Sequence, residues 1–170
     1  MTAYVALLRA VNVGGTGKLP MEDLRQLCED CGFAGAKTYI ASGNVVFKSA
    51  KSEKQVKAVL EKALATYAGK PVGVLVRTEE EMKAVIAKNP FPDAPGNRSL
   101  AIFLDDAPPK DLMETLKGQK NEQVKPGKRE IHVLYDEGMG TSKLVVPAAK
   151  TGTARNMNTV AKLAGMAAEI

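Results

Sequence analysis

Residues 7–18, LLRAVNVGGTGK, begin as an apolar strand and end in a glycine-rich turn with a lysine. The apolar run starts at Tyr4, and its nearly continuous hydrophobic character predicts a strand in the middle of a sheet. Pro20 fits the first position of a helix, and apolar residues recur at helical spacing from Met21 to Cys31. A strand, a glycine turn and a helix together can present backbone N–H groups to an anion. This stretch therefore predicts the start of the fold and one side of a candidate site.

The rest of the first half continues with alternating strand and helix signals. The apolar and turn patterns predict a strand, a return strand, a helix and a final strand over 37–41, 45–48, 53–67 and 72–77. With the opening strand and helix, the order is βαββαβ, which is typical of a ferredoxin-like unit.

The second half repeats this outline after a stretch rich in Pro and Gly, residues 89–97. The patterns predict further strands and helices over 100–104, 109–117, 122–125, 130–135 and from Asn158 onward. We therefore predict an α+β protein of two ferredoxin-like (βαββαβ) halves in tandem, with mostly antiparallel sheets and helices on one face. The predicted subdomains are residues 1–90 and 91–170.

Composition and charge narrow the function classes. The chain has 170 residues, of which 45% are hydrophobic and 25% charged, as in ordinary globular proteins. No apolar run approaches the roughly 18 residues of a membrane span, and the first residues lack a basic start, so we expect a cytoplasmic protein with no membrane partner. Residues 1–78 hold 11 Lys and Arg against 6 Asp and Glu, whereas residues 79–170 hold 13 of each. The excess positive charge of the first half favours an anionic partner, although a solvated basic surface is commoner.

The glycine turn is not a nucleotide-binding P-loop. Asn12 stands where that motif has its first glycine, and Leu19 stands where it has the Ser or Thr that binds magnesium. A simpler anion site stays open, formed by the turn with Gly14, Gly15, Arg9 and Lys18. The alternative is a turn whose glycines only permit positive φ angles.

The other candidate motifs favour structural roles. The turn at Ser42, Gly43 and Asn44 lacks the Gly-x-Ser-x-Gly motif that surrounds the nucleophile of many hydrolases, so it is expected to be a hairpin turn. We expect the single histidine, His132, on a surface or half-buried strand of the other half. Cys28 and Cys31 have CxxC spacing, but they share the apolar face of a helix near its end, so we expect core packing. We expect no metal and no cofactor, because two cysteines and one histidine are too few ligands for a structural zinc site.

Arg155 and Asn156 precede the last predicted helix. Asn156 or Asn158 can cap that helix. An arginine at a helix start is unfavourable for the helix dipole, so Arg155 should have a partner, either a carboxylate or a bound anion.

Three motifs resemble a bacterial family described only as domain of unknown function 1697. They are LRAVNVGG at residues 8–15, TYIASGNVVF at 38–47 and TARNMNTV at 153–160. The resemblance covers essentially the whole chain. It departs at Met157, where the family usually has Trp, and at Cys31, where a plain aliphatic residue is usual. It implies the two-part ferredoxin-like architecture and supplies no activity.

We predict a small anionic ligand or substrate, bound at a polar site between strand ends, and we leave the reaction open. The site residues are Arg9, Asn12, Gly14, Gly15, Lys18, Ser42, Gly43, Asn44, Arg155 and Asn156. This site requires three segments of the chain to converge. One alternative is nucleic-acid binding by the basic first half, for which Tyr39 and Phe47 are available although the usual RNA-binding aromatic pattern is absent. Another is a self-associating module, and the oligomeric state stays open.

Overall fold

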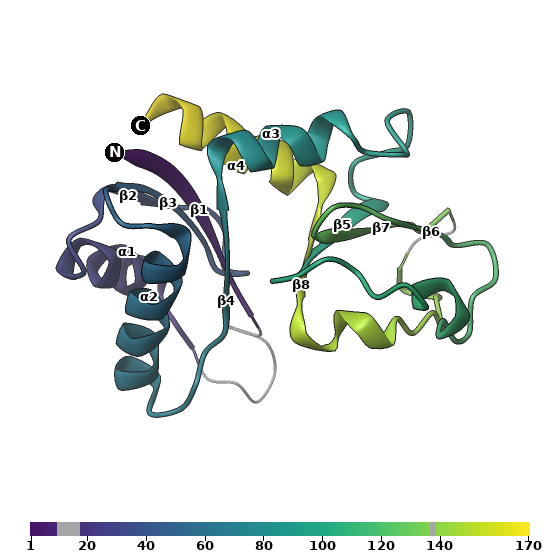
Figure 1. Cartoon of the computed structure of the whole chain (residues 1–170), viewed down its shortest axis with the longest axis horizontal. Coiled ribbons are helices and arrows are strands. Elements are labelled where there is room, and N and C mark those ends of the chain that lie inside the picture. Colours follow the sequence, from purple (N-terminus) through teal and green to yellow (C-terminus); the bar gives the residue numbers. More distant parts are fainter. Residues whose placement is uncertain (10–17, 137–138) are drawn as a thin grey trace. The chain divides into compact units, whose positions relative to one another are not determined.

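The structure is a computed structural model that describes residues 1–9, 18–136 and 139–170. Within these residues the fold is α+β, with four α-helices and two four-stranded antiparallel sheets (Figure 1). The predicted class and the antiparallel sheets are confirmed. The chain forms two compact units, residues 1–83 with 162–170 and residues 84–161, which are described separately below. The predicted subdomain division between residues 90 and 91 stays a prediction.

The first unit contains one sheet and the helices that cover it. Its elements are β1 (Thr2–Leu8), α1 (Met21–Asp30), β2 (Ala34–Thr38), β3 (Asn44–Ser49), α2 (Glu53–Ala68) and β4 (Val74–Thr78). The strand order is β2-β3-β1-β4, so β1 lies between β3 and β4. Its apolar run suits this central position, because both of its faces are buried.

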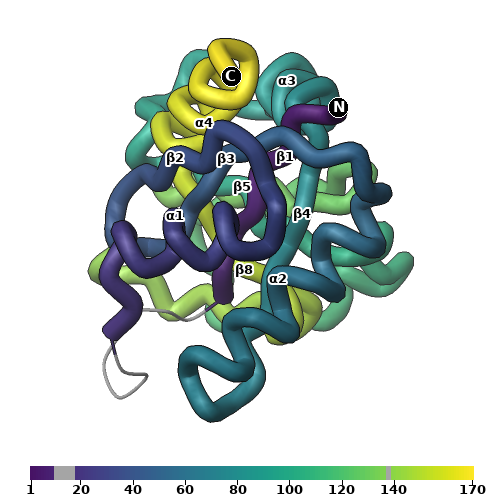
Figure 2. The backbone as a smooth tube through the Cα atoms, turned by 90° about the vertical axis from the view of Figure 1, so that its left-hand side faces the viewer, coloured from purple at the N-terminus to yellow at the C-terminus, as the bar shows by residue number. Residues whose placement is uncertain are grey.

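The helices α1 and α2 lie on the same face of this sheet (Figure 2). In α1, Leu24 and Cys28 face the core, and in α2 the inward stripe is Val56, Leu60 and Leu64. A capping box between Ser52 and Gln55 begins α2. Its end lies at Gly69, whose φ of 71° suits a residue without a Cβ.

Helical residues contact both edge strands of the first sheet. At the start of β4, Val74 N donates to Glu61 Oε2 (3.1 Å), and Lys57 Nζ donates to Val74 O. Along β2 runs the end of α4 (Met157–Glu169): Lys162 Nζ lies 5.9 Å from the Tyr39 ring centroid, and Ile170 lies beside Gly35. These contacts protect edge strands that could otherwise pair with other chains.

The second unit has a sheet with the corresponding strand order, and the described residues between its strands form no α-helix. Its elements are β5 (Ser99–Phe103), the 3₁₀ helix η1 (Leu112–Glu114), β6 (Gln123–Pro126), β7 (Glu130–Leu134), the 3₁₀ helix η2 (Pro147–Thr151) and β8 (Thr153–Asn156). The order is β6-β7-β5-β8. The predicted helix over 109–117 is wrong, since only η1 forms there. Helix α3 (Glu79–Ala87) begins in the first unit and α4 begins in the second.

Two loops cover one face of the second sheet. They contribute Leu112, Leu116, Leu144 and Val146 to a core with Ile131 and other strand residues. A β-bridge joins the loops, with Lys117 N donating to Val145 O (3.1 Å) and Val145 N donating to Lys117 O (2.7 Å). Gly118 permits this approach: its φ is +69°, and a Cβ there would lie 2.2 Å from Lys143 O.

Candidate functional site

Two glycines flank the end of β1 in the first unit. On one side Leu8 N donates to Gly43 O (2.8 Å), and on the other Arg9 N donates to Gly73 O (2.9 Å). The half-buried Arg9 side chain lies across Gly73, where a Cβ would come within 3.0 Å of Arg9 Cδ. At the end of β1, Arg9 thus packs against Gly73, which has no side chain, and lies beside the loop that precedes β3.

That loop is strained and is closed by one buried side chain. Ile40 has a φ of 51°, which is unusual for a β-branched residue. Asn44 is fully buried, and its Nδ2 donates to Tyr39 O (2.8 Å) and to Ser42 Oγ (2.9 Å). Tyr39 N also donates to Asn44 O (2.9 Å). Asn44 therefore organises the loop from inside, and it leaves Ser42 exposed at the turn.

The structure brings together part of the predicted site. Arg9 and residues 42–44 meet at the end of β1, and the exposed Lys18 lies three residues before α1. Asn12, Gly14 and Gly15 lie outside the described residues. Arg155 and Asn156 belong to the second unit, so their predicted convergence with the other two segments stays a prediction.

Arg155 and Asn156 both make local contacts at the end of β8. Arg155 is only 6% exposed, and its Nη1 donates to Thr153 Oγ1 (2.7 Å) and to Ala154 O (2.9 Å). Burial lowers the pKa of its guanidinium to about 10. Asn156 Oδ1 accepts from Thr159 N (2.9 Å), so Asn156 caps α4 as one of the two predicted asparagines.

Cys28 and the histidine are buried, and Cys31 is half-buried. Cys28 packs in the first core as predicted, and burial raises the pKa of its thiol to about 12, which opposes thiolate chemistry. His132 is 3% exposed, so the expected surface or half-buried position is wrong. It lies on β7 and pairs with Ala101 of the sheet's central strand. Among the described residues, no group of three or more His, Cys, Asp or Glu side chains is placed to hold a metal ion.

Sequence reasoning missed two residues near the end of β1 and its neighbouring loop. Gly73 adjoins an apolar strand, and an isolated glycine in such a pattern is a signal of close approach by another group. The exposed Lys162 lies over Tyr39, next to the loop, through a contact between residues 123 positions apart. No local signal predicts that contact, because it depends on how α4 packs along β2.

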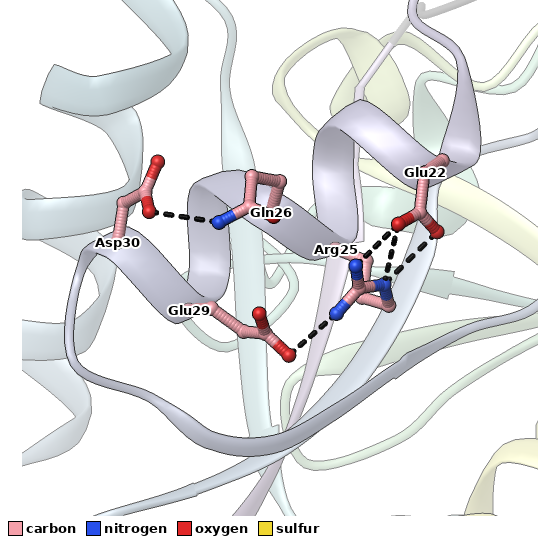
Figure 3. A network of polar contacts seen from close by, with 5 residues as sticks. All are labelled: Glu22, Arg25, Gln26, Glu29 and Asp30. Atoms are coloured by element: carbon pink, nitrogen blue, oxygen red, sulfur yellow. Dashed lines mark hydrogen bonds and ion pairs between the residues drawn. The ribbon is translucent and has the colours of Figure 1, made fainter.

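Of the two aromatic side chains named for nucleic-acid binding, Tyr39 is half-buried. Phe47 is fully buried and stacks on Phe33, with ring centroids 4.3 Å apart. On the outer side of α1, Arg25 is held by Glu22 and Glu29, and Gln26 donates to Asp30 (2.9 Å; Figure 3). This acidic, internally paired face does not attract phosphate groups. Nucleic-acid binding by the basic first half stays a prediction. In the described part of the chain, none of the helices is long and apolar enough to cross a membrane.

Comparisons with known proteins agree with the motifs. The family model described as "Protein of unknown function (DUF1697)" matches residues 1–132. No curated protein matches the chain. Among solved structures, the chain is similar to conserved bacterial protein SP0830 from Streptococcus pneumoniae, with 26% identity, a TM-score of 0.78 and 98% of each chain covered. The family match confirms the resemblance over residues 1–132, and the motif at 153–160 lies outside the matched residues.

Proposed function

The chain belongs to the DUF1697 family, whose description names no activity, and we propose that it binds a small anion at the end of β1. In this proposal Arg9 contacts the anion, the Ser42 hydroxyl donates a hydrogen bond to it, and Lys18 adds positive potential. Gly43 and Asn44 hold the loop that presents Ser42. The proposal is confined to the first unit.

The strained loop carries this proposal. An L-residue in a sparsely populated backbone region costs about 1–3 kcal/mol, and such strain clusters at functional sites. Ile40 carries it here, two residues before Ser42 and within a loop that hydrogen-bonds to the end of β1. Burial of Asn44 and its two donated hydrogen bonds hold the strained conformation in place. A loop needed only to connect β2 and β3 would not require this strain.

Arg9 supplies the chemistry that selects an anion. A guanidinium is planar and can donate two parallel hydrogen bonds to a carboxylate or a phosphate. Contact with Gly73 restricts the Arg9 side chain before any ligand arrives, which lowers the entropy lost on binding. The single histidine of the chain lies on β7 in the second unit, so the first-unit site contains no imidazole base. We therefore propose binding and assign no reaction.

Ligand-induced stabilisation tests the proposal. At ten times the Kd, inorganic phosphate or citrate should raise the Tm by about 3 °C. Arg9→Ala should abolish this increase, and Arg9→Lys should restore only part of it, because lysine lacks the planar fork. Arg25→Ala is the matched control, since it removes the same charge from a site on α1. An equal response in Arg9→Ala and in the wild type would overturn the proposal.

We also propose that each half has the ferredoxin-like arrangement predicted above. The strand orders β2-β3-β1-β4 and β6-β7-β5-β8 support this, because each sheet places its first strand between its third and fourth. The helix-covered face of the first sheet supports it further. In the second half, η1 and η2 occupy the places of the two helices.

A further inference from the structure

A small pocket lies between the two loops of the second unit, apart from the site at Arg9. Residues 120–122, 135–136 and 141–143 line it, and its volume is about 170 Å³. A water molecule occupies about 30 Å³ in the liquid, so the pocket has room for a small organic molecule. Nothing in the proposed function uses this pocket.

The loops that form the pocket are held together. The bridge between Lys117 and Val145 joins them through two backbone hydrogen bonds, directly beside the lining residues. Gly118 lies so close to Lys143 O that any larger residue would separate the loops. The two loops are therefore joined beside the pocket before a ligand binds, which favours affinity because less order is left to impose.

One carboxylate is fixed on the pocket wall. Glu122 Oε1 accepts from Lys120 N (2.7 Å), and Glu122 Oε2 accepts from Ser142 Oγ (2.6 Å). Ser142 Oγ in turn accepts from Leu144 N (3.2 Å). The hydrogen bond from Ser142 lowers the pKa of Glu122, so its charge persists at neutral pH. Each carboxylate oxygen of Glu122 thus accepts one hydrogen bond from the protein and can accept another from a ligand.

The lining as a whole is balanced in charge. The positive charges of Lys120 and Lys143 equal in number the negative charges of Glu122 and Asp136. The remaining lining side chains are an amide, two hydroxyls and a phenol. A simple anion would meet two carboxylates, and a simple cation would meet two ammonium groups. A ligand with one charge of each sign avoids both repulsions.

We propose that this pocket binds a small polar zwitterion of the α-amino-acid class. The ligand ammonium donates to Glu122, and the ligand carboxylate lies beside Lys143 and Lys120. Ser142 positions Glu122. The hydroxyls and the amide of the lining favour a short polar side chain over an apolar one.

Three related probes test the need for both charges. L-serine carries both, N-acetyl-L-serine lacks the ammonium, and ethanolamine lacks the carboxylate. Titrated into the full chain by calorimetry at low salt, L-serine should bind saturably, and the other two should bind at least about tenfold more weakly. No saturable binding of L-serine, or equal binding of N-acetyl-L-serine, would overturn the proposal.

Variants assign the binding to this pocket. Glu122→Gln keeps the acceptor for Ser142 but removes the charge, and it should weaken L-serine binding by about tenfold or more. Glu114→Gln removes the same charge from an exposed position on η1 and should leave binding unchanged. If Glu122→Gln lowers the Tm markedly, Lys143→Met gives the same test from the cationic side. Wild-type affinity in the folded variants would contradict the assignment. Arg9→Ala should bind L-serine normally, which separates this proposal from the proposed function.

Discussion

The two sheets have corresponding strand orders but are covered in different ways. In the first unit, the connections between strands contain the 10-residue α1 and the 16-residue α2. In the second, the described residues of the corresponding connections form the 3-residue η1 and the 5-residue η2. The second unit therefore keeps the strand order although no α-helix forms in the described part of its connections. The apolar strand pattern specifies the sheet, and any segment that buries its face can serve as the cover.

The correspondence extends to the side chains that end each outer strand. Arg77 on β4 is fully buried and Arg155 on β8 nearly so, and each Nη1 donates to the carbonyl of the preceding residue. The next residue caps a helix in both places, with Thr78 Oγ1 accepting from Glu81 N and Asn156 Oδ1 accepting from Thr159 N. The two units thus share a buried arginine followed by a helix-capping residue, although different segments cover their sheets.

The largest expected difference between the units lies in their cores. Leu60→Ala beneath α2 should lower the free energy of unfolding by about 4 kcal/mol, because a rigid helix cannot collapse into the cavity. Leu112→Ala on η1 should cost only about 2 kcal/mol, since its loop can relax. Urea denaturation of both variants measures this. Equal losses would show that the loop cover is as rigid as the helical one.

Substitution of two glycines distinguishes the energetic cost of backbone strain from the cost of steric overlap. Gly69 and Gly118 have φ angles of 71° and 69°, but a Cβ meets nothing within 4 Å at Gly69 and lies 2.2 Å from Lys143 O at Gly118. Gly69→Ala should therefore cost about 1 kcal/mol, and Gly118→Ala about 3 kcal/mol. Thermal and urea unfolding provide the measurement. A Gly118→Ala loss no greater than that of Gly69→Ala would place the bridge outside the stable structure.

The paired helix caps should contribute equally. Thr78→Ala and Asn156→Ala should each lower stability by about 1 kcal/mol, because each leaves a first-turn N–H without its acceptor. Asn156→Ser should recover most of that loss, since serine is also a good cap. If Asn156→Ser is as unstable as Asn156→Ala, the role of Asn156 extends beyond capping.

The smallest effect concerns pH and is confined to the second unit. Burial lowers the pKa of His132 below its usual 6.5, although the charge of Glu130 opposes this. The unfolded chain then binds the proton more readily, so stability should fall as pH drops below about 6.5. His132→Gln should reduce the loss of Tm between pH 7 and pH 5. An unchanged loss in that variant would assign the pH dependence to other groups.

Much of the fold follows from local sequence patterns, and the errors have identifiable causes. The strand at Tyr4–Leu8 and the helix capped by Ser52 have strong local signals, and both form. The predicted strand at 37–41 is displaced to Ala34–Thr38, because Asn44 closes a loop around Ile40. The predicted helix at 109–117 gives way to η1 where residue 117 pairs with Val145 instead. These departures come from contacts between distant residues.

In the candidate site too, local sequence motifs predict some residues, and contacts between distant residues add others. Local motifs indicated Arg9 and the Ser42–Asn44 turn, and β-sheet pairing brings them together at one strand end. Gly73 joins them through its hydrogen bond with Arg9 N, whereas Lys162 joins only through the packing of α4 along β2. Arg155 was singled out because its charge at a helix start needs a partner, and the structure gives it local acceptors at Thr153 and Ala154.

An NMR titration of the full chain with inorganic phosphate tests the central claim most directly. The claim is that the end of β1 binds a small anion through Arg9. It predicts saturable shifts of the Gly43 and Gly73 amides and of Arg9 Nε–H, all lost in Arg9→Ala and retained in Arg25→Ala. Shifts confined to other surfaces, or shifts at Gly43 and Gly73 that persist in Arg9→Ala, would contradict it.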